Sequence, residues 1–196
     1  MSTVVLASGS IIRAKLLSGA GVVFDIKPAN LDERVLKETR ADLAATGLAE
    51  ALAQAKANAV SADVPDALVI GADQVLDCEG RLYDKPVGEE GVRSHLKLLR
   101  GRSHRLISAV CIAEAGAISW SHTAIAELTM RDFNDAFIEY YIQQAGPGVQ
   151  SAVGAYRLEG IGVQLFEWIT GDYFTILGLP LLPLLAFFRQ RGILEL

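Results

Sequence analysis

The stretch that decides the fold reads Val4-Val5-Leu6-Ala7-Ser8-Gly9-Ser10-Ile11-Ile12-Arg13-Ala14-Lys15-Leu16-Leu17. The run Val4–Leu6 favours a short buried strand that ends at Ala7. Ser10 stands where a helix N-cap is expected, and Arg13 falls in the first turn of that helix. Backbone N–H groups at such a turn can face an anion, and a guanidinium can bind a phosphate through two hydrogen bonds. Because strand–turn–helix openings are common in α/β proteins, the stretch alone predicts a fold class and not a function.

Composition sets the next limits. The chain has 196 residues, of which 51% are hydrophobic and 21% charged, which is typical of a well-packed globule. This length suits one α/β domain, or two tightly joined lobes. The net charge of −5 argues against binding to nucleic-acid polymers, which need a surface that neutralises phosphates. Cys78 and Cys111 lie far apart without a CxxC pattern, so we expect two reduced core thiols rather than a zinc site.

We expect no membrane partner. The longest apolar run, Ile176–Phe188, is shorter than the ~20 residues of a membrane span, and Pro180 and Pro183 interrupt it. The N-terminus lacks the basic region of a signal peptide. The sequence therefore predicts a soluble, cytoplasmic protein.

The rest of the chain alternates between strand and helix patterns, which predicts a mixed α/β domain with an antiparallel portion. One helix, over 43–60, carries an apolar stripe at Leu48, Leu52, Ala55 and Ala59, with Lys56 beside it. A buried central strand over 68–72 is expected to end at Asp73-Gln74. The other expected elements are strands at 22–26, 75–78, 81–83, 104–113, 117–128 and 163–170, helices at 88–99, 134–144 and 180–191, and a polar turn at 30–34.

Charged side chains gather at the ends of these elements. The cations are Arg13, Lys56 and Lys85, and the acids include Asp73. Ligands of open α/β sheets bind at the carboxyl ends of strands, where Asp73 is expected. A carboxylate there can hold Mg²⁺ or accept a proton from an attacking water.

Each of these residues also has a simpler interpretation. Asp73 is compatible with an Asx-turn, Lys85 with a solvated lysine before Pro86, and Lys56 with a lysine that extends its ammonium to solvent. His104 is more typical of a strand residue with a structural hydrogen bond. The chain has no Ser–His–Asp arrangement, no GxGxxG and no Walker lysine. Taken together, several cations and a few acids at element ends suit a polyphosphate and a divalent metal.

No single short motif of the chain is specific for a protein family, but the ordered set of them is. The chain resembles the Maf family over nearly its whole length. The resemblance is carried by Leu6-Ala7-Ser8-Gly9-Ser10, Arg13, Leu16-Leu17, Asp32-Glu33, Leu52-Ala53, Lys56-Ala57, Gly71-Ala72-Asp73, Lys85-Pro86, Gly101, His104, Gly154-Ala155-Tyr156, Glu159-Gly160, Gly171-Asp172-Tyr173 and Gly178-Leu179-Pro180.

The resemblance implies a nucleoside triphosphate pyrophosphatase, which cleaves between the α- and β-phosphates to give a monophosphate and pyrophosphate. It also implies an elongated mixed β-sheet flanked by helices, the α/β fold shared with inosine-triphosphate pyrophosphatases. On this basis residues 1–196 form a single domain with two lobes around a central cleft. A divalent cation (Mg²⁺, Mn²⁺ or Co²⁺) and a homodimer are implied as well.

The resemblance also implies roles for individual residues. Asp73 would accept the proton, and Glu33 and Asp73 would lie near the metal. The side chains around the phosphates would be Ser8, Ser10, Arg13, Lys56 and Lys85. The family usually has Ser-Pro-x-Arg where this chain has Ser10-Ile11-Ile12-Arg13, so a preset helix start is lost although Ser10 can still cap.

Three positions differ between branches of the family, here Ile12, Gln74 and Glu159. The branch that acts on dTTP and UTP has Arg, Thr and Gln at these three positions, whereas the 7-methyl-GTP branch has Gln and Glu at the last two positions. An ionised Glu159 only accepts hydrogen bonds, so it suits the N1–H and N2–H₂ donors of guanine and the charge of 7-methylguanine. Ile12 offers no donor to a pyrimidine carbonyl, but it also lacks the aromatic stacking surface of the 7-methyl-GTP branch.

Two alternatives remain open on the sequence. One is a non-catalytic, nucleotide-sensing regulator of cell division and septum formation. The other is a pyrophosphatase for other nucleotides, such as ITP or dTTP and UTP.

Overall fold

The computed structural model describes residues 3–195 and divides the chain into two compact units. Unit 1 comprises residues 3–74, 107–124 and 173–195, and unit 2 comprises residues 75–106 and 125–172. The organisation of residues 1–196 as one domain with two lobes around a cleft stays a prediction.

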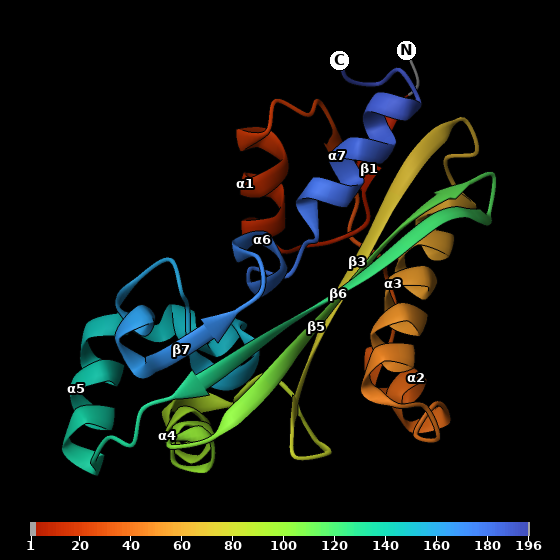
Figure 1. The fold of residues 1–196 in the computed structure, drawn as a ribbon. Coiled ribbons are helices and arrows are strands. Elements are labelled where there is room, and N and C mark those ends of the chain that lie inside the picture. Colours follow the sequence, from red (N-terminus) through yellow and green to blue (C-terminus); the bar gives the residue numbers. More distant parts are fainter. Residues whose placement is uncertain (1–2, 196) are drawn as a thin grey trace. The chain divides into compact units, whose positions relative to one another are not determined.

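A single mixed sheet runs through the chain. Its strands are β1 (Thr3–Leu6), β2 (Asp25–Ile26), β3 (Ala67–Cys78), β4 (Arg81–Tyr83), β5 (Ser103–Glu114), β6 (Ala117–Met130) and β7 (Phe166–Thr170). Within the described residues the order is β2-β1-β3-β5-β6-β7, and β4 pairs with β3. β1 is parallel to β2 and β3, whereas β3–β4 and β6–β7 are antiparallel. With helices beside it (Figure 1), this sheet confirms the predicted mixed α/β class.

Helices cover both faces of the sheet in unit 1. They are α1 (Ile11–Gly19), α2 (Glu33–Thr39), α3 (Ala45–Ser61), α6 (Tyr173–Ile176) and α7 (Leu181–Gln190). In Figure 1, α1 and α7 lie on one side of the strands, and α2 and α3 lie on the other. The core on the first side draws buried residues from α1, β1, β3, β5 and α7, among them Leu17, Leu6, Ile70, Ile112 and Phe188.

Two predictions for the segment before β3 are wrong. The turn expected at 30–34 contains the start of α2, because the Asp32 side chain caps the N–H groups of Arg34 and Val35 at 3.0 and 3.2 Å. The buried face of α3 also differs from the expected stripe, since Ala59 is exposed and Lys56 is buried. That face consists of Leu48, Ala49, Leu52, Ala53, Lys56, Ala57, Val60 and Ser61.

The central strand is longer than predicted. β3 continues from Ala67 to Cys78, so Asp73 and Gln74 lie within the strand and not at its carboxyl end. The neighbouring strand β1 does end there, with Leu6 opposite Ile70. β3 continues because its later residues pair with β4 through the predicted hairpin, in which Cys78 lies opposite Arg81. The edge left by the end of β1 is where the candidate site forms.

Unit 2 is built around α4 (Gly88–Leu99) and α5 (Asp135–Ala145), which begin and end close to the predicted residues. Asn134 caps α5 as expected, accepting from the N–H of Phe137 at 2.9 Å. Three 3₁₀ helices follow, η1 (Pro147–Ser151), η2 (Val153–Ala155) and η3 (Ile161–Leu165). Because η3 takes up the first residues of the strand predicted from Val163, β7 begins only at Phe166.

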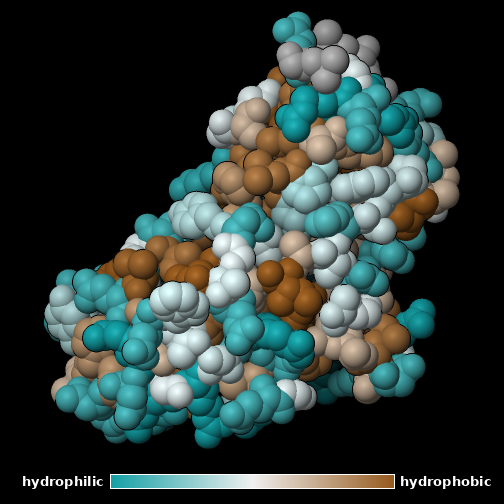
Figure 2. Space-filling view, in the orientation of Figure 1, coloured by the Kyte–Doolittle hydropathy of each residue, from teal (hydrophilic) through white to brown (hydrophobic). Residues whose placement is uncertain are grey.

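Figure 2 shows apolar side chains at the surface over α1 and α7, where Leu182 is 56% exposed. Of the helices in residues 3–195, none is both long enough and apolar enough to cross a bilayer.

Candidate active site

The predicted anion-binding corner forms at the end of β1. Ser10 caps α1 by accepting from the N–H of Arg13 at 3.4 Å. The buried Ser8 hydroxyl accepts from the N–H of Ser10 at 3.3 Å and from Nη1 of Arg13 at 3.1 Å. The predicted serine cap and the predicted arginine in the first turn of the helix are both confirmed.

The guanidinium of Arg13 also links two backbone segments that are far apart in the sequence. Its Nη1 donates to the carbonyl of Ala72 at 2.9 Å, and its Nε donates to the carbonyl of Gly178 at 2.8 Å. β1 has already ended opposite Ala72, so the guanidinium takes the place of the missing strand neighbour. Burial lowers the pKa of Arg13, and the carboxylates of Asp73 and Glu33 oppose this shift. Among residues 3–195, no acceptor binds Nη2 of Arg13, which leaves that edge for a ligand.

The centre of the site is the ammonium of Lys56. Its Nζ lies 2.5 Å from Oδ1 of Asp73 and 2.8 Å from Oε1 of Glu33. Only 10% of the Lys56 and Asp73 side chains is exposed, whereas Glu33 is 46% exposed. Glu33 reaches the ammonium because it is the first residue of α2, directly after the Asp32 cap. The structure thus brings together three of the predicted residues on one face of β3.

This arrangement can serve a phosphate reaction. Asp73 is a carboxylate held by a cation, so it can orient a water and accept its proton. The carboxylates of Asp73 and Glu33 both lie close enough to raise the pKa of Arg13, so the corner and the Lys56 cluster are coupled electrostatically.

The two carboxylates also fit a divalent metal. Glu33 and Asp73 each place one oxygen within 2.8 Å of the Lys56 ammonium, so the two carboxylates lie close together, and a metal ion would be held beside that ammonium and not in its place. Mg²⁺ is commonly held by one or two carboxylates together with water and substrate phosphates. No group of three His, Cys, Asp or Glu side chains in the described part of the chain is placed to hold a metal without substrate.

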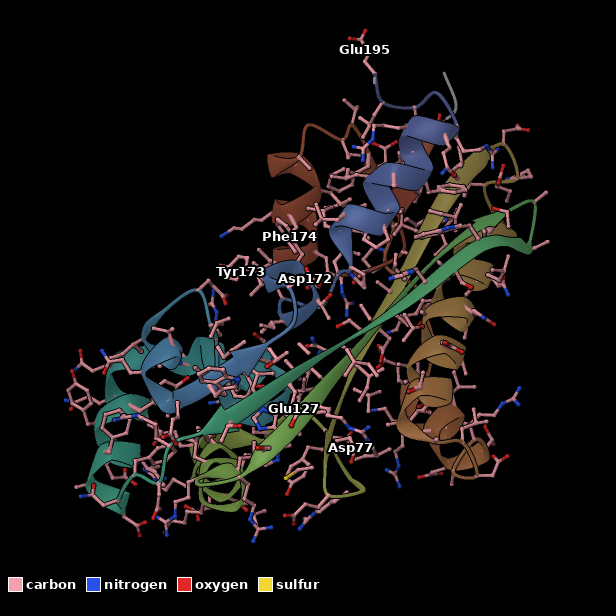
Figure 3. The ribbon with its side chains drawn as sticks, viewed as in Figure 1. Asp77, Glu127, Asp172, Tyr173, Phe174 and Glu195 are labelled. Atoms are coloured by element: carbon pink, nitrogen blue, oxygen red, sulfur yellow. The ribbon has the colours of Figure 1, made fainter. Side chains whose placement is uncertain are left out.

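Gln74 lies on the opposite face of β3 from Asp73. Its Nε2 carries two hydrogens and has three acceptors in reach, the Ser108 hydroxyl at 2.9 Å and the carbonyls of Thr175 and Ile176 at 3.0 Å, so one hydrogen is shared. Those carbonyls belong to α6, the short helix whose Tyr173 and Phe174 are labelled in Figure 3. The other predicted specificity residue in unit 1, Ile12, is half-buried on α1.

A pocket of about 370 Å³ opens beside the serine corner. Its lining includes Ser8, Ser10, Ile11, Lys15 and Ile26. Ile11 is 73% exposed, so the pocket has an apolar wall at the start of α1.

Two predicted residues belong to unit 2. Lys85 is exposed, with no ion-pair partner among residues 3–195. Glu159 follows η2 and pairs with Nε of Arg157 at 2.9 Å, and 24% of its side chain is exposed. Arg157 therefore balances the charge of the carboxylate that the sequence singled out.

The family model described as Maf-like protein matches residues 3–191. The chain belongs to the Maf-like protein family.

Relatives of this Maf-like chain carry two kinds of name. It is 50% identical to the "Nucleoside triphosphate pyrophosphatase" of Paramagnetospirillum magneticum, over 95% of this chain and 97% of the relative. It is 45% identical to the protein of that same name from Maricaulis maris, over the full length of both chains. It is also 46% identical to the "7-methyl-GTP pyrophosphatase" of Brucella abortus, over 97% of each chain.

Two residues of this Maf-like site, Ser108 and Gly71, were given no role on the sequence. Ser108 lies in the middle of a strand pattern, and its contact with Gln74 joins residues 34 positions apart, so no local signal marks it. Gly71 is different, because a glycine inside a buried apolar run signals a close backbone approach. A Cβ on Gly71 would fall onto the carbonyl oxygen of Ala53 and come within 2.7 Å of Cβ of Ala57.

Proposed function

We propose that this chain is a metal-dependent nucleoside triphosphate pyrophosphatase that hydrolyses its substrate to a nucleoside monophosphate and pyrophosphate. The observation that carries the proposal is the buried Lys56 ammonium between Asp73 and Glu33, next to the serine corner and Arg13. The names of the Maf-like relatives support the same reaction class. Phosphoryl transfer needs neutralised charge and a positioned water, and this cluster can supply both.

In the proposed reaction, water attacks a phosphorus next to the oxygen that bridges the α- and β-phosphates. A new P–O bond forms and the bond from that phosphorus to the bridging oxygen breaks. Asp73 takes the proton that the attacking water loses. The ammonium of Lys56, 2.5 Å away, holds this carboxylate in place.

The remaining side chains bind the triphosphate. Ser8, Ser10 and Nη2 of Arg13 face the phosphates from the end of β1, and Lys56 and Lys85 supply further positive charge. Glu33 and Asp73 would hold a divalent cation such as Mg²⁺, Mn²⁺ or Co²⁺. When bound, that cation neutralises charge that develops on the phosphate oxygens.

The preferred substrate in this proposal is a purine or a modified purine nucleotide such as 7-methyl-GTP. Glu159 supports it, because a carboxylate accepts hydrogen bonds from the N–H groups of guanine and opposes the carbonyl oxygens of pyrimidines. Ile12 adds an apolar side chain with no donor. Some Maf-like relatives carry the 7-methyl-GTP name, which agrees with this choice.

A nucleotide panel tests the proposal directly. The purified chain is incubated with 7-methyl-GTP, GTP, ITP, dTTP and UTP in the presence of Mg²⁺, Mn²⁺ or Co²⁺, and pyrophosphate is assayed. We expect release, fastest with a purine nucleotide. Nucleotide binding with no release from any member would contradict the enzyme and favour the nucleotide-sensing regulator. Fastest release from ITP, dTTP or UTP would leave the reaction in place and overturn the preference.

Asp73→Asn tests the role of the carboxylate. This variant keeps the shape of the side chain but removes the base, so we expect kcat to fall by about 10²–10⁴-fold while nucleotide still binds. Asp63→Asn is the control, because Asp63 belongs to an exposed pair with Lys27. Unchanged turnover in Asp73→Asn would remove Asp73 from the mechanism.

Glu159→Gln tests the substrate preference. The amide can donate to a pyrimidine carbonyl, so we expect the ratio of UTP to GTP hydrolysis to rise. An unchanged ratio would show that Glu159 does not read the base.

The proposal extends to assembly and location. We place the chain in the cytoplasm as a homodimer of one-domain subunits that does not bind nucleic-acid polymers. The net charge of −5 supports the last point. Light scattering on the purified chain measures the assembly, and a monomeric mass would contradict the dimer.

A further inference from the structure

Gln74 has an unusually complete set of acceptors around one end of its amide. The carbonyls of Thr175 and Ile176 and the hydroxyl of Ser108 all lie within 3.0 Å of Nε2. The Ser108 hydroxyl has one hydrogen, and it donates that hydrogen to the carbonyl of Thr175 at 2.8 Å. Toward Gln74 the hydroxyl can therefore only accept.

This arrangement fixes which way the amide points. If the amide turned over, its oxygen would face three acceptors and no donor. Ser108 is fully buried, so no water replaces its hydroxyl. The amide nitrogen must stay against Ser108 and α6, and the oxygen Oε1 must face the other way.

Oε1 is the end of Gln74 that a ligand can reach. Among residues 3–195 it has no hydrogen-bond partner. It is also not a buried atom, so solvent or a ligand can contact it. A Cβ placed on Gly178 would lie 3.6 Å from Oε1 and 3.5 Å from Nη2 of Arg13. The same small space therefore has a fixed acceptor on one side and a free cationic donor on the other.

We propose that Ser108 is a positioning residue that fixes Gln74 as an obligatory hydrogen-bond acceptor, so the substrate must offer a donor from its nucleoside part at this point. The inference rests on the proposed function. The donor has two possible sources, a sugar hydroxyl or a base N–H. Both have the chemistry that Oε1 requires, and Arg13 would hold the adjoining phosphate.

The first experiment is a double-mutant cycle with full-length protein and GTP, or UTP if it is hydrolysed faster. Because Gln74 would contact a non-reacting part of the substrate, Ser108→Ala should raise KM by about 3- to 10-fold and change kcat by less than about twofold. In a Gln74→Leu background, Ser108→Ala should have no further effect on KM. Equal effects in both backgrounds would show that Ser108 does not act through Gln74.

Matched variants separate positioning from a general loss of packing. Ser61→Ala removes another fully buried hydroxyl, which accepts from the N–H of Gly116 and lies outside the site, so it should leave KM unchanged. Ser108→Cys keeps the volume with a weaker acceptor and should give an intermediate KM. A rise in KM for Ser61→Ala as large as that for Ser108→Ala would overturn the proposal.

The second experiment identifies the donor. The analogues of the reference nucleotide, GTP or UTP, are its 2′-deoxy form, its 3′-deoxy form and the form methylated at the N–H of the base ring. When GTP is the reference, ITP is added because it lacks the amino group of guanine. The wild type should discriminate by about 3- to 10-fold against the analogue that lacks the donor, and Gln74→Leu should abolish this ratio. A deoxy analogue points to the sugar, and a methylated analogue or ITP points to the base. If Gln74→Leu does not fold, the ratio in Ser108→Ala decides.

The outcomes distinguish failure of the inference on Ser108 and Gln74 from failure of the proposed pyrophosphatase function. Pyrophosphate release with the same analogue ratios in wild type and variants would overturn this inference alone. No release from any nucleotide by the wild type would overturn the proposed function and this inference with it.

Discussion

Lys56 is a cation on the face of a helix that packs against the sheet, and it is the residue on which the site depends. Its ammonium lies 2.5 Å from a carboxylate that is itself only 10% exposed. A buried ion pair is strongly destabilised when one partner is removed, because the other charge stays behind without compensation. The same contact therefore serves both the folded state and the proposed chemistry.

Lys56→Met is expected to cost about 3 kcal/mol of unfolding free energy, since Asp73 would lose its cation in a buried place. Lys27→Met is the matched control, because Lys27 and Asp63 form a pair at 2.9 Å whose side chains are 44% and 63% exposed. Exposed pairs of this kind contribute about 0–1 kcal/mol. Urea denaturation measures both variants, and equal losses would show that burial of the Lys56 pair is unimportant.

His104 gives a second prediction at this scale. It is 2% exposed, its Nε2 lies 2.7 Å from the hydroxyl oxygen of Tyr156, and burial lowers its pKa to about 4. Between pH 6.5 and 4 the unfolded chain binds a proton at this histidine and the folded chain does not. Stability should therefore fall as the pH drops through this range, by up to about 3 kcal/mol.

Comparing the wild type with His104→Gln isolates this contribution. Glutamine keeps a hydrogen-bonding group near Tyr156 but does not titrate in this range. The stability difference between the two proteins should shift in favour of His104→Gln as the pH is lowered from 7 to 4. A constant difference across that range would contradict a neutral buried histidine.

At the scale of elements, Gly71 sets how closely α3 approaches β3. Gly71 and Asp73 lie two positions apart on the strand and so share a face, where α3 presents Ala53, Ala57 and Lys56. A Cβ on Gly71 would come within 2.7 Å of Cβ of Ala57. The small residues at this contact allow the lysine to reach the carboxylate.

Gly71→Ala should therefore affect stability and turnover together. Forcing α3 away from β3 should cost about 3 kcal/mol and lengthen the contact between Lys56 and Asp73. We expect a lower kcat in any folded fraction. Gly19→Ala is the control, because a Cβ at that position in α1 meets no atom within 4 Å. Thermal melts and a pyrophosphate assay compare the two, and wild-type behaviour of Gly71→Ala would contradict this account.

The same contact explains what the sequence could predict and what it could not. Capping signals are local, so Ser10 and Asn134 correctly mark the starts of α1 and α5. The buried face of α3 was misassigned because alanines carry little periodic signal. The close approach at Gly71, and not the helix itself, decides that Ala53 and Ala57 face inward.

The candidate site residues also divide into those that the sequence could predict and those that it could not. Lys56, Asp73 and Glu33 were expected from their positions at element ends and from the family resemblance, and they do meet. The role of Arg13 as a link to the carbonyl of Ala72 could not be expected, because it depends on β3 outlasting β1. Ser108 gave no signal, since its contacts with Gln74 and Thr175 join residues 34 and 67 positions apart.

At the scale of the whole molecule, the boundaries between the two units fall inside strands and not in the loops between them. β3, β5 and β6 each contribute residues to both units, with the boundaries after residues 74, 106 and 124. Backbone hydrogen bonds along a continuous strand link the stability of its two ends. We therefore expect the chain to unfold in one cooperative transition although it has two compact units.

The two tryptophans allow a direct test, because each unit contains one. Trp120 on β6 stacks on Phe187 in unit 1 with ring centroids 5.1 Å apart, and Trp168 on β7 belongs to unit 2. Trp168→Phe leaves a probe of unit 1, and Trp120→Phe leaves a probe of unit 2. Since Trp168 is 69% exposed, its anisotropy reports local order better than its emission maximum.

Each single-tryptophan variant is unfolded in urea and followed by tryptophan anisotropy and by far-ultraviolet circular dichroism. If the strands couple the units, the two signals within each variant should share one midpoint, whichever unit carries the probe. Comparison within a variant removes any change in stability that the substitution itself causes. Midpoints that differ by more than about 0.5 M urea between the two signals would show that the units unfold separately. In that case nucleotide binding, which in our proposal uses residues of both units, would be lost with the first unit to unfold.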